Sequence, residues 1–349
     1  MCEDFLTLPP LNRPVSQSFF VCIFNQQLIP TINLFSTLAT TQPPRHHTMD
    51  WGNKQQVLER VAQNSDDLRH ASEELKRDRT VVMAAVTQNG DVSGDTLEYA
   101  SDEFKNDKEV VMAAVTRWGT ALQYASDNMQ EDKEVVMAAV AENGHALQHA
   151  SNKWQEDKGV VLAAVARDGS ALQWASDALR EDHDFVMAAV VQNGRALGAV
   201  SDELKGDRMV VLAAVAQDGS ALEHASTEWQ GDRTVVMVAV AQDGSALEHA
   251  SEEWQSDRNV VMTAVTQRGH ALQWASTVLK GNIEVVLAAV AQNGWALAYA
   301  SKEMKGDREV VLAAVAQNGC ALQYASEALK GDVDFVGLFQ QEEEKTSST

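Results

Sequence analysis

The chain has 349 residues and a formal net charge of -22 at pH 7, with 45% hydrophobic and 22% charged residues. Acidic and basic side chains balance within residues 1–48, so the whole excess of negative charge lies in residues 49–349. A surface with this charge repels phosphate backbones, which argues against a nucleic-acid partner and favours a basic protein segment.

Residues 1–48 differ in composition from the rest of the chain. All six prolines lie there, and the apolar run at residues 19–24 is too short to span a bilayer. This composition predicts a disordered extension, or a mis-annotated one with Met49 as the true start. We predict a cytoplasmic protein without a membrane segment, although the extension leaves organelle targeting open.

Residues 49–339 predict a repeat array with a period of 25 residues, and residues 340–349 an acidic, flexible tail. A fixed period of this length is typical of a solenoid. One longer interval follows Gly90, where residues 91–94 are inserted. The first residue of a paired apolar step marks each copy at Val81, Val110, Val135, Val160, Phe185, Val210, Val235, Val260, Val285, Val310 and Phe335.

One copy, at residues 232–256, predicts two helices. Asp232 is a good N-cap for the first helix, and Gly244 suits the left-handed residue that ends it. This first helix is apolar almost all round, which predicts burial on every face. The second helix, at residues 245–255, has one apolar side that covers the first. The predicted fold is therefore all-α, an α-solenoid of about ten short helix-turn-helix repeats.

A column of rings recurs once per copy, two residues after the leucine of the predicted second helix. It lies roughly 200° from that leucine on a helical wheel, away from the buried stripe. Exposed rings with a polar edge make good interface anchors, so this ring column is the candidate binding ladder. The alternative is that each ring packs on the neighbouring copy and fills space left by small alanines. The candidate residues are Tyr99, Tyr124, His149, Trp174, His224, His249, Trp274, Tyr299 and Tyr324.

A second aromatic column exchanges freely with leucine and methionine, which is typical of core filling. Its aromatic members are Phe104, Trp154, Trp229 and Trp254. A lysine or arginine also follows most of the capping aspartates. These cations recur every 25 residues, but the neighbouring acids argue against a positive strip.

No pattern indicates a metal, cofactor or catalytic site. His145 and His149 lie one helical turn apart, but no third ligand is close in sequence. Only Cys320 of the three cysteines lies in the array, which excludes a disulfide framework inside it. We find no nucleophile arrangement, phosphate-binding glycine loop or paired carboxylates. We therefore predict no cofactor and no enzymatic activity.

The repeated motif is Asp-x-x-Val-Val-x-Ala-Ala-Val-x-x-x-Gly-x-Ala-Leu-x-x-Ala-Ser, in phase from residue 57 to about residue 336. It resembles a family of tandem helical repeats catalogued as a domain of unknown function, and this resemblance implies no activity. We predict a non-enzymatic scaffold that binds a protein or peptide along an extended surface. Two alternatives stay open, a glycan- or ring-binding array that uses the ring column and an enzyme with a site assembled in space. The oligomeric state is left open.

Overall fold

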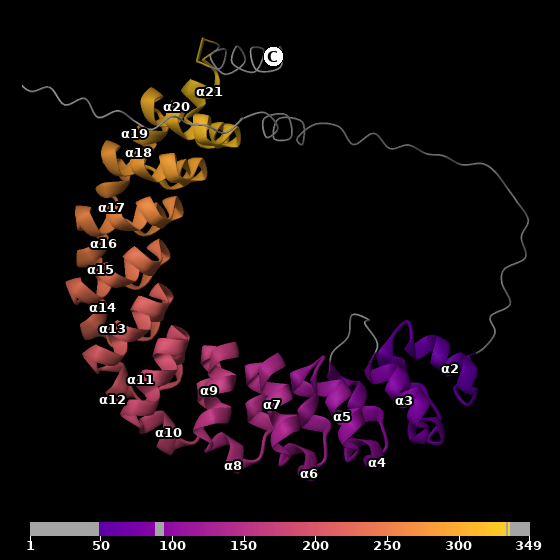
Figure 1. Ribbon diagram of the computed structural model, residues 1–349. Coiled ribbons are helices and arrows are strands. Elements are labelled where there is room, and N and C mark those ends of the chain that lie inside the picture. Colours follow the sequence, from indigo (N-terminus) through magenta and orange to yellow (C-terminus); the bar gives the residue numbers. More distant parts are fainter. Residues whose placement is uncertain (1–48, 88–93, 333, 336–349) are drawn as a thin grey trace, which may run out of the picture. The chain divides into compact units, whose positions relative to one another are not determined.

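The structure is a computed structural model that describes residues 49–87, 94–332 and 334–335. Every regular element of these residues is helical, which confirms the predicted all-α solenoid of short repeats (Figure 1). The described chain forms two compact units, an N-terminal unit at residues 49–242 and a C-terminal unit at residues 243–335. The predicted extension and tail lie outside the described residues.

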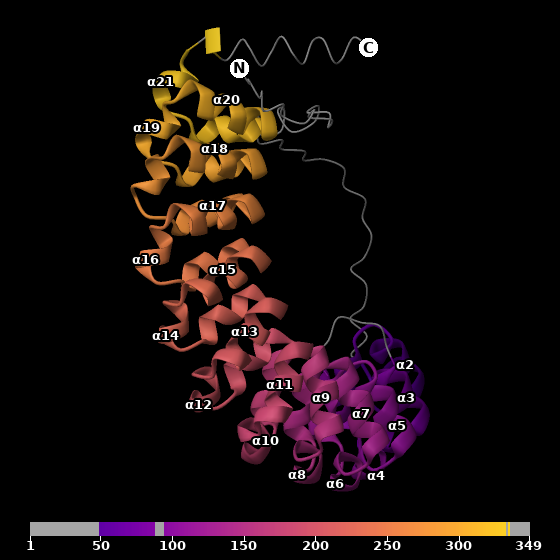
Figure 2. The ribbon, with the colours of Figure 1, turned by 60° about the vertical axis from the view of Figure 1, so that its left-hand side comes forward.

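Each copy contains three helical elements, one more than predicted. A long α-helix is followed by a six-residue 3-10 helix and then by a short helix of three to five residues. The predicted second helix at residues 245–255 is instead split into η9 (Gly244–His249) and α16 (Glu252–Gln255). Ala250 between them has an extended backbone. Within each unit the short helices form one row and the long helices form another (Figure 1, Figure 2).

The elements of the N-terminal unit follow this order in every copy. Its long helices are α2 (Lys54–Val61), α3 (Arg79–Val86), α5 (Lys108–Val115), α7 (Lys133–Glu142), α9 (Lys158–Arg167), α11 (His183–Gln192), α13 (Arg208–Gln217) and α15 (Arg233–Gln242). Its six-residue 3-10 helices are η1 (Ser65–His70), η3 (Gly94–Tyr99), η4 (Gly119–Tyr124), η5 (Gly144–His149), η6 (Gly169–Trp174), η7 (Gly194–Ala199) and η8 (Gly219–His224). Its short helices are η2 (Leu75–Arg77), α4 (Asp102–Lys105), α6 (Asp127–Gln130), α8 (Asn152–Gln155), α10 (Asp177–Glu181), α12 (Asp202–Lys205) and α14 (Thr227–Gln230).

The C-terminal unit repeats the same elements. Its long helices are α17 (Arg258–Gln267), α18 (Ile283–Gln292) and α20 (Arg308–Gln317). Besides η9, its six-residue 3-10 helices are η10 (Gly269–Trp274), η12 (Gly294–Tyr299) and η13 (Gly319–Tyr324). Besides α16, its short helices are η11 (Leu279–Gly281), α19 (Lys302–Lys305) and α21 (Glu327–Lys330).

The aspartate column caps the long helices, as predicted. Asp132 Oδ1 accepts the amide N–H groups of Glu134 over 2.9 Å and Val135 over 3.2 Å. Asn282 does the same for α18, where the column changes residue type. Each cap satisfies amide groups that have no partner inside the first turn of its helix.

The glycine column does not end the long helices in the left-handed conformation, contrary to the prediction. The residue before each glycine is extended instead, and Asn143 there caps η5 by accepting the His145 N–H over 3.0 Å. A Cβ on Gly144 would come closer than 3.0 Å to the carbonyl oxygen of Ala164 in the next copy. The same overlap would occur at Gly119, Gly194, Gly244, Gly269 and Gly294. Glycine is therefore required because adjacent copies approach closely at this point.

The long helices expose one face, which corrects the prediction that they are buried all round. In α13 the buried side consists of Val210, Val211, Ala214 and Val215. Leu212 and Ala213 are only half-buried, and Met209 is 61% exposed. Neighbouring long helices pack on two sides of α13, and η7 and η8 pack on a third. In the described part of the chain no element covers the fourth side, so it faces solvent.

A column of glutamines that no sequence pattern singled out joins successive copies. Gln242 Oε1 accepts the N–H of Gly219 over 2.7 Å, and its Nε2 donates to the carbonyl of Gln217 over 3.2 Å. Gln292 makes the equivalent pair of bonds in the C-terminal unit. One glutamine side-chain amide thus forms hydrogen bonds with a backbone N–H and a backbone carbonyl of the previous copy, both at the junction between its long helix and its 3-10 helix.

We expect Gln242→Ala to lower the free energy of unfolding by about 1–3 kcal/mol, because the buried Gly219 N–H loses its acceptor. Gln242→Glu should lower the free energy of unfolding by less. Glu142 stands at the equivalent position of α7, and its carboxylate accepts the N–H of Gly119. Urea unfolding of both variants measures the difference. Equal losses for the two variants would contradict this role of the amide oxygen.

Candidate functional site

The ring column lies at the last residue of the 3-10 helices. All nine candidate residues are half-buried, and Ala199 takes the same position in η7. His70, at this position in η1 of the first copy, is exposed. The rings therefore present an edge to solvent while most of each ring lies against protein.

Four rings of the column, Tyr124, Trp174, Tyr299 and Tyr324, meet the residue 29 positions earlier, in the preceding copy. The Tyr124 hydroxyl donates to Asp95 Oδ1 over 2.9 Å, and Trp174 Nε1 donates to His145 Nδ1 over 3.2 Å. In the C-terminal unit the centroid of the Tyr299 ring lies 5.7 Å from that of His270, edge-on. The ring column thus joins successive copies, as the packing alternative predicted, and its candidate role in binding stays a prediction.

The environment of the rings is consistent with this position between copies. Burial, and then the bond to Asp95, raises the pKa of Tyr124 to about 12. Burial also lowers the pKa of His149. His224 packs so closely on Gly198 that a Cβ there would lie 3.0 Å from the imidazole.

The second aromatic column is only partly core. Phe104 is buried, as predicted, but the tryptophans of this column are half-buried. Trp154 Nε1 donates to the carbonyl of Glu131 over 3.0 Å, and Trp229 Nε1 donates to that of Gly206 over 2.8 Å. The indole nitrogen explains the difference, because it must reach a hydrogen-bond acceptor at the surface.

His145, Asp168 and Ser170 meet between η5 and η6, although sequence spacing gave no sign of it. His145 Nε2 lies 3.1 Å from Asp168 Oδ2 and 3.1 Å from Ser170 Oγ. His145 Nδ1 accepts the Trp174 N–H, so the neutral imidazole carries its proton on Nε2. The nitrogen beside Ser170 is therefore a donor and is not the base that a serine nucleophile needs.

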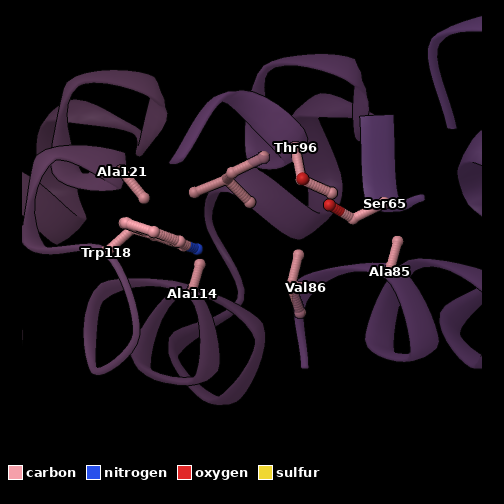
Figure 3. Close-up of a pocket in the computed structure, with 8 residues that line it drawn as sticks. Ser65, Ala85, Val86, Thr96, Ala114, Trp118 and Ala121 are labelled. Atoms are coloured by element: carbon pink, nitrogen blue, oxygen red, sulfur yellow. The ribbon is translucent and has the colours of Figure 1, made fainter. Parts of the chain in front are cut away.

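A small cavity lies between the first copies of the N-terminal unit. It has an empty volume of about 250 Å³, part of it open to solvent, and it reaches Leu97 in η3. Figure 3 shows the hydroxyl groups of Ser65 and Thr96 turned toward each other, while Trp118 lies at the other end. None of the described residues that line it is acidic, lysine, arginine or histidine.

Several of the cations that follow the capping aspartates are paired with acids of the next copy. Lys108 Nζ lies 2.9 Å from Asp132 and 2.7 Å from Glu134 in the next copy. Lys158 pairs with Asp182 over 2.6 Å in the same way. This agrees with the prediction that these cations form no positive strip.

We expect the array to lose stability in acid through these caps. The hydrogen bond from Lys108 lowers the pKa of Asp132. Desolvation opposes this shift, and hydrogen bonds from backbone N–H groups add to it. Because the folded pKa is depressed, the stabilisation is present above the unfolded pKa of about 4 and disappears as pH falls through the lower folded value. The double variant Asp107→Asn/Asp132→Asn keeps cap acceptors but cannot titrate. Its Tm should therefore fall less than the native Tm between pH 5 and 2.5, and an identical fall would contradict the assignment.

The solvent side of the long helices forms a second candidate surface, which we call the long-helix face. It consists of the fifth, sixth and ninth positions counted from the first residue of each long helix from α3 to α20, which in α13 are Leu212, Ala213 and Ala216. The fifth position is always Met or Leu and is half-buried in every copy. These residues are Met83, Met112, Met137, Leu162, Met187, Leu212, Met237, Met262, Leu287 and Leu312.

The long-helix face carries no charge at these three positions. Its sixth and ninth positions are alanine, threonine or valine, and Val191 at the ninth position is 60% exposed. Ion pairs such as Lys108 with Glu134 lie along the N-terminal ends of the helices. The surface is therefore apolar and shallow, and it recurs with the repeat.

Within residues 49–87, 94–332 and 334–335, no three His, Cys, Asp or Glu side chains come together as metal ligands would. Over the same described residues, no helix combines the length and apolar character needed to cross a bilayer.

These features define an α-helical tandem-repeat protein whose copies are joined by the ring column, by the side-chain amides of the glutamine column and by ion pairs. The chain belongs to the family described as Domain of unknown function (DUF4116), whose sequence profile matches six times in tandem, at residues 53–93, 91–130, 132–180, 182–230, 232–280 and 282–330. The last four matches begin 50 residues apart, so each covers two 25-residue copies. No curated protein matches the chain, and neither does any solved structure.

Proposed function

We propose that the protein is a non-enzymatic scaffold that binds a protein or peptide segment along the long-helix face. The observation that carries this proposal is the partly exposed Met/Leu and alanine surface, which recurs in each long helix from α3 to α20. Soluble proteins seldom leave contiguous apolar surface exposed without an interaction to use it. Repeat proteins commonly bind partners along such an extended surface.

The spacing of the repeats favours an extended peptide. Packed helices lie about 8–10 Å apart, and a chain in the extended polyproline II conformation advances about 3.1 Å per residue, with three residues per turn. Three peptide residues therefore span roughly one copy, so every third side chain of the peptide meets the next Met or Leu. Within one unit, a segment of about 12 residues would cover four copies.

The charge of the chain favours a basic partner. Many lysines and arginines are paired with aspartate or glutamate, as at Lys108 and Lys158. Exposed acids such as Glu103, Glu203 and Glu253 remain on the short helices. A peptide with lysine or arginine between its apolar positions would gain from this negative field, and its binding would weaken with salt.

A second candidate function uses the ring column in the C-terminal unit. There His270 and Trp295 pack edge-on against Tyr299 and Tyr324, each pair with ring centroids 5.7 Å apart. With Trp274, these rings form an aromatic row that supports the alternative of a glycan or other ring-bearing ligand.

Selection of peptides from a random display library by residues 49–349 tests the proposal. We expect selected peptides to carry apolar residues at every third position and to lose at least about tenfold in affinity when Ala138→Glu and Ala163→Glu place charges on the long-helix face. The matched control, Gln123→Glu with Gln173→Glu, changes exposed residues beside the ring column and should leave affinity unchanged. Loss only in the control variant would move the site to the ring column. Failure to select any peptide would argue against a peptide scaffold.

A further inference from the structure

The ring-column contact between η5 and η6 has an imidazole nitrogen as its hydrogen-bond acceptor. Trp174 donates its indole N–H to His145 Nδ1 over 3.2 Å. At the equivalent contact, Tyr124 donates to the carboxylate of Asp95. We infer that protonation of His145 breaks the Trp174 contact, so that this junction between copies loosens as the pH falls from 8 to 5.

The argument rests on which imidazole nitrogen holds the proton. Nδ1 accepts from Trp174, so the single proton of the neutral ring is on Nε2. That N–H faces two acceptors, Asp168 Oδ2 at 3.1 Å and Ser170 Oγ at 3.1 Å. The Ser170 hydroxyl in turn donates to Asp168 Oδ1 over 2.7 Å. Every hydrogen-bonding group of the cluster has a partner in this one tautomer.

The imidazolium cannot keep this arrangement. A second proton occupies Nδ1, where it meets the Trp174 N–H, and two donors then face each other at a distance suited to one hydrogen bond. The Nε2 side is unaffected, because its acceptors still face an N–H. Protonation therefore acts on Trp174 alone, and the indole must turn away or lose its partner.

The charged neighbours of His145 do not reverse this outcome. Asp168 is the one charged group of the described chain within ion-pair distance of the imidazole. Burial raises the pKa of Asp168, but hydrogen bonds from Ser170 and the nearby His145 outweigh it and hold that pKa below its usual range. Asp168 therefore stays a carboxylate between pH 5 and 8 and can accept a hydrogen bond from His145 Nε2 throughout this range. Other titratable residues on η5 and on the elements packed against it are Tyr124, Lys133, Glu134, Glu142, His149, Lys153, Lys158 and Arg167.

The chain offers a matched set of variants. His145→Asn places an amide oxygen near the position of Nδ1, so it accepts from Trp174 but does not titrate. His149→Asn removes the other histidine of η5 and leaves the Trp174 contact intact. If His145→Asn does not fold, His145→Ser replaces it, because serine occupies the same position at Ser170 and Ser220.

The test follows the indole N–H of Trp174 by nuclear magnetic resonance in the full chain labelled with ¹⁵N-tryptophan, with Trp174→Phe to assign the signal. Between pH 8 and 5 we expect water exchange, corrected for its intrinsic pH dependence, to rise about fivefold in one transition, as loss of one hydrogen bond implies. The transition should persist in His149→Asn and disappear in His145→Asn or His145→Ser. An unchanged signal in the native chain would overturn the inference, and so would the same transition in the His145 variants.

Discussion

Gly144→Ala is expected to destabilise the N-terminal unit by about 3 kcal/mol or more, the upper range for overpacking of a close contact. The added methyl group would overlap the carbonyl oxygen of Ala164 in the next copy. That oxygen also accepts the N–H of Asp168 over 2.9 Å inside the next junction. It cannot move away without breaking this hydrogen bond, so two copies must separate to admit one methyl group.

Gly231→Ala is the matched control in the same unit. Gly231 has a right-handed helical backbone, and the nearest atom to an added Cβ is a carbonyl oxygen at 3.4 Å. Alanine fits there and should be neutral or stabilise by about 0.4–1 kcal/mol. Urea unfolding of both variants gives the comparison. Similar stabilities for the two would show that the glycine column does not hold the copies together.

We expect a variant without four rings of the column to have a much lower Tm than the native chain. Its substitutions are Tyr124→Ala, Trp174→Ala, Trp274→Ala and Tyr299→Ala. Truncating a fully buried aromatic ring costs about 3–5 kcal/mol, and we take roughly half of that for half-buried rings. Each unit contains two of the substituted rings, so if their effects add, the free energy of unfolding of each unit falls by about 3–5 kcal/mol. Tyr124 and Trp174 also lose their hydrogen bonds to the preceding copy.

The control for this variant is Gln123→Ala with Gln173→Ala. Both glutamines are exposed and directly precede rings of the column. Thermal unfolding followed by circular dichroism should show little change in this control. If the four-ring variant kept its native Tm and lost only a ligand, the rings would be a binding surface and our account of them as contacts between copies would be wrong.

The sequence allowed prediction of those features that depend on neighbouring residues. The period, the all-α class and the capping aspartates follow from local spacing, because a cap such as Asp132 acts within its own first turn. The packing reading of the ring column also followed from small residues in the adjacent copy.

Other features depend on which copy approaches which, and one period does not contain that information. Gly144 was assigned to a helix end because its contact with Ala164 lies in the next copy. The long helices were expected to be buried because their apolar character is uniform, yet no element of the described chain covers one side of α13. The cluster around His145 unites residues of two copies, so the sequence of a single copy does not contain it.

The most direct test of the proposed function uses the methionines of the long-helix face as reporters. A display-selected peptide is bound to residues 49–349, and methionine oxidation by dilute peroxide is followed at each residue by mass spectrometry. The account predicts slower oxidation of Met112, Met137 and Met187 in the complex, while Met129 on short helix α6 oxidises at its free rate. Protection of Met129 with no change at Met112, Met137 and Met187 would contradict the account, because it would place the peptide on the short helices instead.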